Sequence, residues 1–126
     1  MERFFLICLG GAVGTGSRYL VSLWAAQRFG STFPYGTMIV NLSGCFIIAA
    51  VMYTALTLGW SPTLRLTITI GFLGGLTTYS SFNFETSRLI EEGALSAAAI
   101  NATVTVCGGF IAGLLGLVFA KTLLGR

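Results

Sequence analysis

The chain has 126 residues, of which 55% are hydrophobic and only 9% are charged. A soluble surface needs interspersed charges, so this composition excludes a soluble globular protein and indicates an integral membrane protein. The formal net charge of +3 comes from basic residues scattered singly along the chain. A nucleic-acid-binding surface requires clustered basic residues, so we expect no nucleic-acid partner.

Four apolar blocks follow one another, at residues 4–26, 35–58, 64–90 and 95–124. Each approaches or exceeds the ~20 residues that an α-helix needs to cross a bilayer. The connections at 27–34, 59–63 and 91–93 are short, which forces consecutive helices to run antiparallel. We predict an all-α integral membrane fold with four transmembrane helices, forming a single domain over residues 1–126.

The third block is unusual for a membrane span. Its residues 71–85, GFLGGLTTYSSFNFE, place glycines, hydroxyl groups and aromatic rings in the middle of a membrane-length segment. Backbone polar groups in hydrocarbon must be satisfied, so irregular backbone survives there only when it is buried in protein or lines a watery path. We therefore predict that the third helix is broken mid-span and that the break marks an ion or substrate site.

The polar side chains within the spans are mostly neutral. The chain has no His and no Asp, and its carboxylates are Glu2, Glu85, Glu91 and Glu92. Proton relays, metal-dependent hydrolysis and Ser-His-Asp catalysis therefore have too few parts, and we expect no enzyme. The hydrogen-bond donors of the spans are Thr37, Asn41, Ser43, Thr77, Thr78, Ser80, Ser81, Asn101, Thr103 and Thr105. Donors without carboxylates suit an anion.

Helical spacing sorts some of these groups. Thr37 and Asn41 lie four residues apart and share a helix face, while the rings of Tyr79 and Phe82, three apart, stack on adjacent turns. Polar side chains in spans also bond neighbouring helices, at a modest gain of ~0.6 kcal/mol per pair. For a single Thr we favour that packing role, whereas for Asn41 packing and ion binding are evenly balanced.

Two further patterns bear on assembly. Three G-x-x-x-G pairs, at 10/14, 71/75 and 109/113, permit close helix contacts, either within one chain or between chains. Four helices cannot readily enclose a polar route, so conduction would require an oligomer. In the predicted topology one side carries Arg3, Arg65, Lys121 and Arg126, and the other carries Arg28, Arg88 and, near the middle or far end of the first span, Arg18. This even split means either that a span boundary is misplaced or that the chain inserts in both orientations and pairs with an inverted copy.

The segment 71–82, together with GTMIVNL at 36–42 and GGAVG at 10–14 followed by Arg18, resembles the Fluc family of small fluoride channels. The resemblance covers essentially the whole chain. It implies an antiparallel, dual-topology homodimer in the cell inner (plasma) membrane, surrounded by lipid, with two fluoride pores at its interface and a structural sodium ion at its centre. It also implies passive, fluoride-selective export down the electrochemical gradient.

The resemblance also implies roles for particular residues. The pore residues would be Thr37, Asn41, Tyr79, Ser81, Phe82 and Thr105. Arg18 would lie at a pore vestibule, although snorkelling to the membrane interface is an equal alternative for it. The backbone carbonyls of Gly74 and Thr77 would bind the sodium ion. The chain departs from the usual T-T-F-S-T-F pattern at Tyr79 and Ser81, and Tyr79 adds a polar hydroxyl to the pore.

Two other functions fit the size of the chain. A small multidrug-type, proton-coupled exporter normally needs a carboxylate in its first span, and none lies between residues 3 and 27. A non-transporting membrane assembly subunit would explain the glycine pairs. It would leave the cluster of donors and aromatic rings in the third span unexplained.

Overall fold

The computed structural model describes residues 1–125, and these form helices without any strand. Three helices, α1 (Glu2–Phe29), α2 (Tyr35–Thr57) and α6 (Leu95–Leu123), are long and apolar enough to cross a membrane. The remaining crossing consists of α3 (Pro62–Leu66), the π-helical segment η1 (Thr67–Leu73), α4 (Gly74–Leu76) and α5 (Tyr79–Glu91). The structure confirms the predicted all-α membrane fold and the predicted interruption of the third crossing. Arg126, one of the basic residues counted above, lies outside the described residues.

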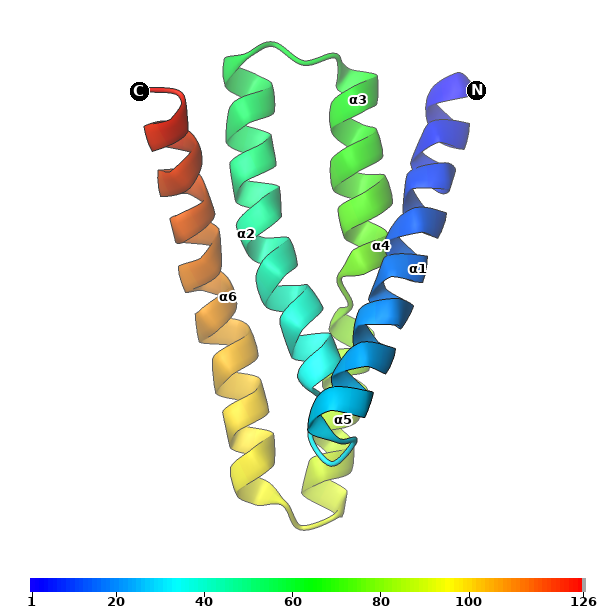
Figure 1. The fold of residues 1–126 in the computed structure, drawn as a ribbon, viewed down its shortest axis with the longest axis vertical. Helices are drawn as coiled ribbons and strands as arrows, with labels where there is room; N and C mark the ends of the chain where they lie inside the picture. Colours follow the sequence, from blue (N-terminus) through cyan, green and yellow to red (C-terminus); the bar gives the residue numbers. More distant parts are fainter. Residues whose placement is uncertain (126) are drawn as a thin grey trace.

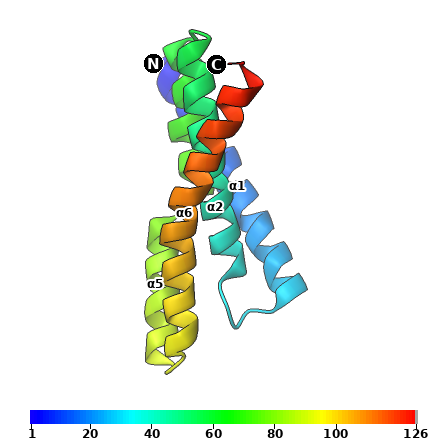
Figure 2. The same ribbon diagram turned by 90° about the vertical axis from the view of Figure 1, so that its left-hand side faces the viewer.

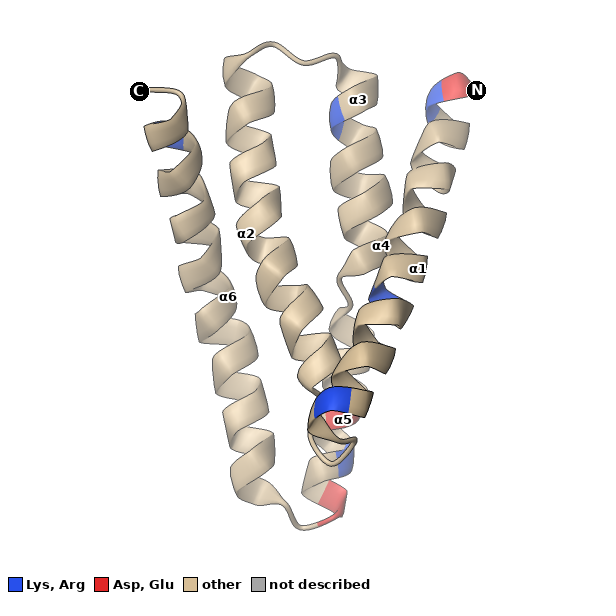
Figure 3. Cartoon of the chain, viewed as in Figure 1, with Lys and Arg blue, Asp and Glu red and all other residues tan. Residues whose placement is uncertain are grey.

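The chain runs up and down between two ends (Figure 1). Both termini and the α2–α3 connection lie at one end, and the α1–α2 and α5–α6 connections lie at the other. A hydrogen bond of 3.3 Å from Arg3 Nε to Thr63 Oγ1 ties the N-terminus to the α2–α3 connection. Charged residues gather at the two ends, apart from a basic position midway along α1 (Figure 3). The arrangement agrees with the antiparallel order expected from the short connections.

Helix pairs hold the fold together. Helix α2 packs along α6, and α1 packs against η1 and α4. Turned by 90°, the α5–α6 pair separates from the lower parts of α1 and α2 (Figure 2). The small buried core around Val40, Leu73 and Leu76 joins α2 to η1 and α4. The third crossing is therefore anchored before its break and diverges from α1 and α2 beyond it.

The first two G-x-x-x-G pairs pack on each other within one chain. A Cβ added at Gly71 would lie 2.6 Å from the carbonyl oxygen of Ile7, and a Cβ at Gly14 would collide with the carbonyl of Phe72. The backbones of α1 and the third crossing thus touch directly. Of the two interpretations of these pairs, the structure shows packing within the chain.

Candidate ion pathway at the broken helix

The break in the third crossing lies at Thr77 and Thr78. Helix α4 ends at Leu76, and the next two residues are extended, with φ −86° and ψ 155° at Thr77 and φ −152° and ψ 115° at Thr78. The Thr78 hydroxyl accepts a hydrogen bond of 3.1 Å from the Ser81 N–H and so caps α5. The glycines at 71, 74 and 75 are helical, so the break falls within the predicted segment 71–85 but beyond its glycines. Hydroxyl residues form the break, and two of the glycines, Gly71 and Gly75, allow close packing against α1.

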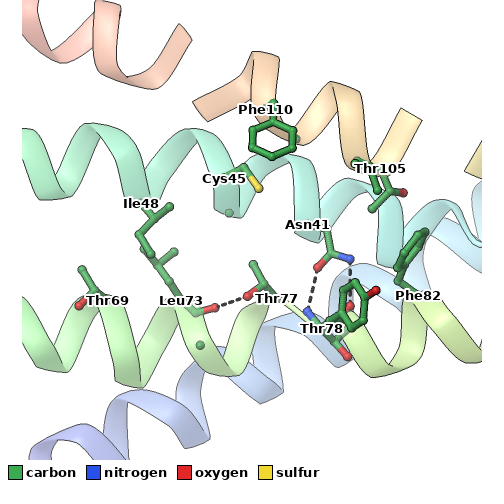
Figure 4. A pocket seen from close by; sticks show the side chains of 15 residues that line it. Asn41, Cys45, Ile48, Thr69, Leu73, Thr77, Thr78, Phe82, Thr105 and Phe110 are labelled. Carbon is green, nitrogen blue, oxygen red and sulfur yellow. Dashed lines mark hydrogen bonds between the residues drawn. The ribbon is translucent and has the colours of Figure 1, made fainter. Parts of the chain in front are cut away.

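Asn41 holds the break from the neighbouring helix α2. Its Nδ2 donates to the Thr78 carbonyl at 3.0 Å, and its Oδ1 accepts from the Thr78 N–H at 2.8 Å. Figure 4 shows the amide turned toward this backbone. Both ends of the amide therefore have partners on the third crossing. This is the packing role, which the sequence left evenly balanced against ion binding for Asn41.

A cavity of about 460 Å³ lies beside the break. It collects six of the predicted site residues: Asn41, Gly74, Thr77, Tyr79, Phe82 and Thr105. The rings of Tyr79 and Phe82 lie with centroids 5.7 Å apart and planes inclined by 55°, so the predicted ring pair is present. Phe82 is 7% exposed, whereas Tyr79 is 76% exposed on the outside of the single chain. The cavity is thus open toward the surface that bears Tyr79.

The hydroxyl groups near this cavity differ in their partners. Thr105 Oγ1 is buried and has no hydrogen-bond partner within residues 1–125. Its side chain projects from α6 toward Phe82 in Figure 4. Ser81 Oγ accepts a hydrogen bond of 3.0 Å from the Thr78 hydroxyl and does not line the cavity. The Thr105 hydroxyl is therefore available to a ligand, while Ser81 belongs to the capped start of α5.

Thr37 lies at a second cavity of about 170 Å³, near the α1–α2 connection. Its hydroxyl donates to Glu85 Oε1 at 2.8 Å, and Arg88 lines the same cavity. Thr37 and Asn41 thus serve different cavities. Sequence reasoning gave Glu85 no role and described a donor track without carboxylates, which is wrong at this point. The sequence did contain a signal for Glu85: a carboxylate within a membrane span is costly, so such a residue usually has a polar partner or a function.

Arg18 reaches the break from α1. Its Nη1 lies 3.4 Å from the Thr77 carbonyl oxygen, and the side chain is half-buried. The guanidinium therefore points to the middle of the crossing, and the snorkelling alternative does not describe its position. Arg18 does not line the larger cavity. It reaches the break from α1, a helix that contributes no residue to the lining of that cavity.

The break also releases backbone carbonyls. In a continuous α-helix the Thr78 N–H would donate to the Gly74 carbonyl, and the Ser81 N–H to the Thr77 carbonyl. Asn41 Oδ1 takes the first of these N–H groups and Thr78 Oγ1 takes the second. Carbonyl oxygens without helical donors fit a hard cation, which prefers oxygen ligands. The residues present therefore fit the sodium site that the resemblance implies.

A chain with three membrane-length helices and an interrupted third crossing is a multi-pass membrane protein. Its residues 5–117 match the family described as CrcB-like protein, Camphor Resistance (CrcB), and the chain belongs to this family. It is 50% identical to a protein of Anaeromyxobacter sp. (strain K) named fluoride-specific ion channel FluC, over 100% of this chain and 97% of the relative.

Two like-named proteins extend this comparison. One, from Sorangium cellulosum (strain So ce56), is 50% identical over 98% of each chain. Another, from Citrifermentans bemidjiense (strain ATCC BAA-1014 / DSM 16622 / JCM 12645 / Bem), is 47% identical over 98% of this chain and 100% of the relative. These matches confirm the resemblance to the Fluc family. Because the relatives carry the name of an ion channel, they also confirm the expectation that the chain is not an enzyme.

Proposed function

We propose that this chain is a passive, fluoride-selective channel of the cell inner (plasma) membrane, which exports fluoride down its electrochemical gradient. The name shared by relatives that match the whole chain supports the choice of ion. The observation that carries the proposal is the cavity at the break, which combines the Tyr79 and Phe82 rings with a Thr105 hydroxyl that has no partner among the described residues. These groups offer donors and positive ring edges to an anion.

Several weak contacts suit fluoride better than one strong contact. Moving a small ion into a low-dielectric medium costs on the order of 20 kcal/mol, whereas one hydrogen bond to a charged group contributes about 1.5–3 kcal/mol. The Thr105 hydroxyl, the ring edges and retained water would share this cost beside the break. Along the same route the Thr37 hydroxyl would contribute at the second cavity and the Ser81 hydroxyl at the start of α5, and each contact would stay weak enough for release. Arg18 would raise the local anion concentration at the vestibule.

The functional unit is an antiparallel homodimer with two pores at its interface. This part of the proposal rests on the polar surface that one chain leaves uncovered at membrane depth. Ser80, Asn83 and Ser87 are exposed on one face of α5, and Gly74 is exposed at the break. Lipid cannot satisfy such groups, whereas a second copy and a water-filled pore can. The even distribution of basic residues supports insertion in both orientations.

A structural sodium ion lies at the centre of this dimer in our proposal. Gly74 and Thr77 of both copies would hold it through their backbone carbonyls, supported by the capture of the N–H groups that would otherwise bond them. Bound sodium supplies positive charge that joins the two broken helices. It stays in place and is not transported.

Efflux from liposomes containing the purified protein tests the function. We expect fluoride to leave under its own gradient, with a rate set by membrane voltage, and chloride to be retained. One observation favours the alternative function of a proton-coupled exporter. Glu85 is a carboxylate within the third crossing, and such an exporter needs a carboxylate inside the membrane. Obligatory coupling of fluoride movement to protons would favour the exporter, and equal passage of chloride would overturn selectivity.

A further inference from the structure

We infer that Asn41 and Thr78 are positioning residues for the central cation, because their side chains release the Gly74 and Thr77 carbonyls for binding. The inference rests on the sodium site of the proposed function. It assigns Asn41 a task different from contact with the permeating anion. Neither side chain touches the cation in this account, and both act on the backbone that does.

The argument begins with the donors that the break displaces. The Thr78 N–H is the helical donor for Gly74, and it donates to Asn41 Oδ1 at 2.8 Å. The Ser81 N–H is the helical donor for Thr77, and it donates to Thr78 Oγ1 at 3.1 Å. Each carbonyl assigned to the cation is therefore one whose helical donor a side chain has taken.

The Asn41 amide also selects among the carbonyls. Its Nδ2 donates to the Thr78 carbonyl at 3.0 Å and so occupies that oxygen. The Thr78 carbonyl is thereby withdrawn from the set that a cation can use, while those of Gly74 and Thr77 have lost their helical donors. The Thr77 carbonyl accepts one long hydrogen bond of 3.4 Å from Arg18 Nη1 and keeps its second lone pair for a cation. An amide can do both tasks because it carries a donor and an acceptor on one planar group.

Because the Thr78 N–H is buried, the loss of its bond to Asn41 would force it to find another partner. Thr78 is buried, with 8% of its surface exposed, and within the chain its N–H has Asn41 Oδ1 as its partner. A buried N–H without a partner is strongly disfavoured. If Asn41 Oδ1 were removed, the nearest helical acceptor would be the Gly74 carbonyl, and bonding there would extend α4 and consume the cation ligand.

Packing keeps the neighbouring residue in place. A Cβ added at Gly44 of α2 would collide with the Thr77 Cγ2 methyl, so this helix fits closely around Thr77 as well as bonding Thr78. The Thr77 hydroxyl donates to the Leu73 carbonyl at 2.9 Å and is turned back along the third crossing. Helix α2 thus orients both residues of the break.

The test measures sodium affinity independently of fluoride flux. Purified dimer would be titrated with sodium against N-methylglucamine at constant ionic strength, and the sodium concentration giving half-maximal thermal stabilisation would be recorded. Asn41→Ala and Thr78→Val should each raise this midpoint at least about tenfold, a difference of about 1.4 kcal/mol. Thr78→Ser keeps the capping hydroxyl and should bind sodium like the parent protein.

Thr105→Val is the matched control, because Thr105 lines the same cavity and has no contact with the break hydrogen bonds. It should lower fluoride flux and leave the sodium midpoint unchanged. If Asn41→Ala does not assemble, the Thr78→Val and Thr78→Ser pair decides the question. Sodium midpoints that stay within about twofold of the parent in Thr78→Val would overturn the inference. No sodium stabilisation of the parent protein would instead overturn the sodium site itself.

Discussion

Tyr79 is the residue at which the cavity and the outer surface of the chain meet. Its ring lines the cavity beside Phe82, and 76% of its surface is exposed. A ring edge offers an anion a diffuse positive region, whereas a phenolic hydroxyl can donate a stronger hydrogen bond and slow release. In the proposed dimer this hydroxyl faces the pore or the partner chain.

We expect Tyr79→Phe to raise the fluoride turnover rate with selectivity unchanged, and Tyr79→Ile to lower the rate because the ring edge is lost. Single-channel recording in planar bilayers, with dimer content checked by size-exclusion chromatography, would measure both. Equal rates for the Tyr, Phe and Ile proteins would remove Tyr79 from the pore and leave it a packing role.

Arg18 places a permanent positive charge beside a proposed cation ligand, since its Nη1 lies 3.4 Å from the Thr77 carbonyl oxygen. Two positive charges near one carbonyl repel each other, so Arg18→Gln should tighten sodium binding by at least about threefold. The same change should slow fluoride entry because the attraction at the vestibule is lost.

Sodium-dependent thermal stabilisation and fluoride efflux would report the two effects of Arg18→Gln separately. Arg28→Gln, which removes a charge from the last turn of α1, serves as the control for net charge. An unchanged sodium midpoint in Arg18→Gln would show that the guanidinium exerts no influence on the cation site.

The contact between α1 and the third crossing brings two backbones together just before the break. A Cβ added at Gly75 would lie 2.5 Å from the Gly11 carbonyl oxygen, which is backbone and cannot rotate away. Gly75→Ala should therefore destabilise the protein by about 1–3 kcal/mol, the usual cost of overpacking.

Gly16→Ala is the control for Gly75→Ala, because among residues 1–125 a Cβ at Gly16 meets nothing within 4 Å beyond its own neighbours in the helix. Equilibrium unfolding in detergent micelles would compare the two variants. A Gly75→Ala protein as stable as Gly16→Ala would mean that the helices can separate slightly at little cost.

Sequence could predict the elements because membrane length and apolar composition are properties of single segments. Spans 35–58 and 95–124 agree closely with α2 (Tyr35–Thr57) and α6 (Leu95–Leu123). The position of the break was harder. Glycines suggested it, but the hydroxyl cap at Thr78 and the amide from α2 determine it, and the second of these requires a tertiary contact.

The candidate site, like the fold, could be predicted only in part. The resemblance to the Fluc family identified Thr105 and the ring pair as site residues, and the cavity brings them together. The bond from Thr37 to Glu85 joins residues 48 positions apart, and no periodicity within one helix can reveal such a pair. Sequence patterns could therefore nominate groups but not assign their partners.

At the scale of the whole molecule the distribution of charge bears on the proposed antiparallel dimer. Within the described chain, Arg3, Arg65 and Lys121 belong to the end that holds the termini, and Arg28 and Arg88 to the other. A near-even distribution leaves both orientations accessible, and an antiparallel dimer needs both.

Adding three Lys residues after the C-terminus should fix one orientation and abolish fluoride efflux. Co-expression with a copy biased in the opposite sense, by Lys residues in the α1–α2 connection, should restore it. Cysteine labelling from each side of the membrane would verify the orientations. Full activity from one biased copy alone would exclude the antiparallel dimer.

The backbone contact of α1 with the third crossing also sets a register. Gly14 meets the Phe72 carbonyl, and Arg18, one helical turn further along α1, meets the Thr77 carbonyl. A slide of α1 by one residue would bring a Cβ against the backbone and carry the guanidinium off the break. In the proposed channel, substitutions at these glycines would therefore shift the Arg18 guanidinium relative to the break and change fluoride conductance without altering any group that binds the ion.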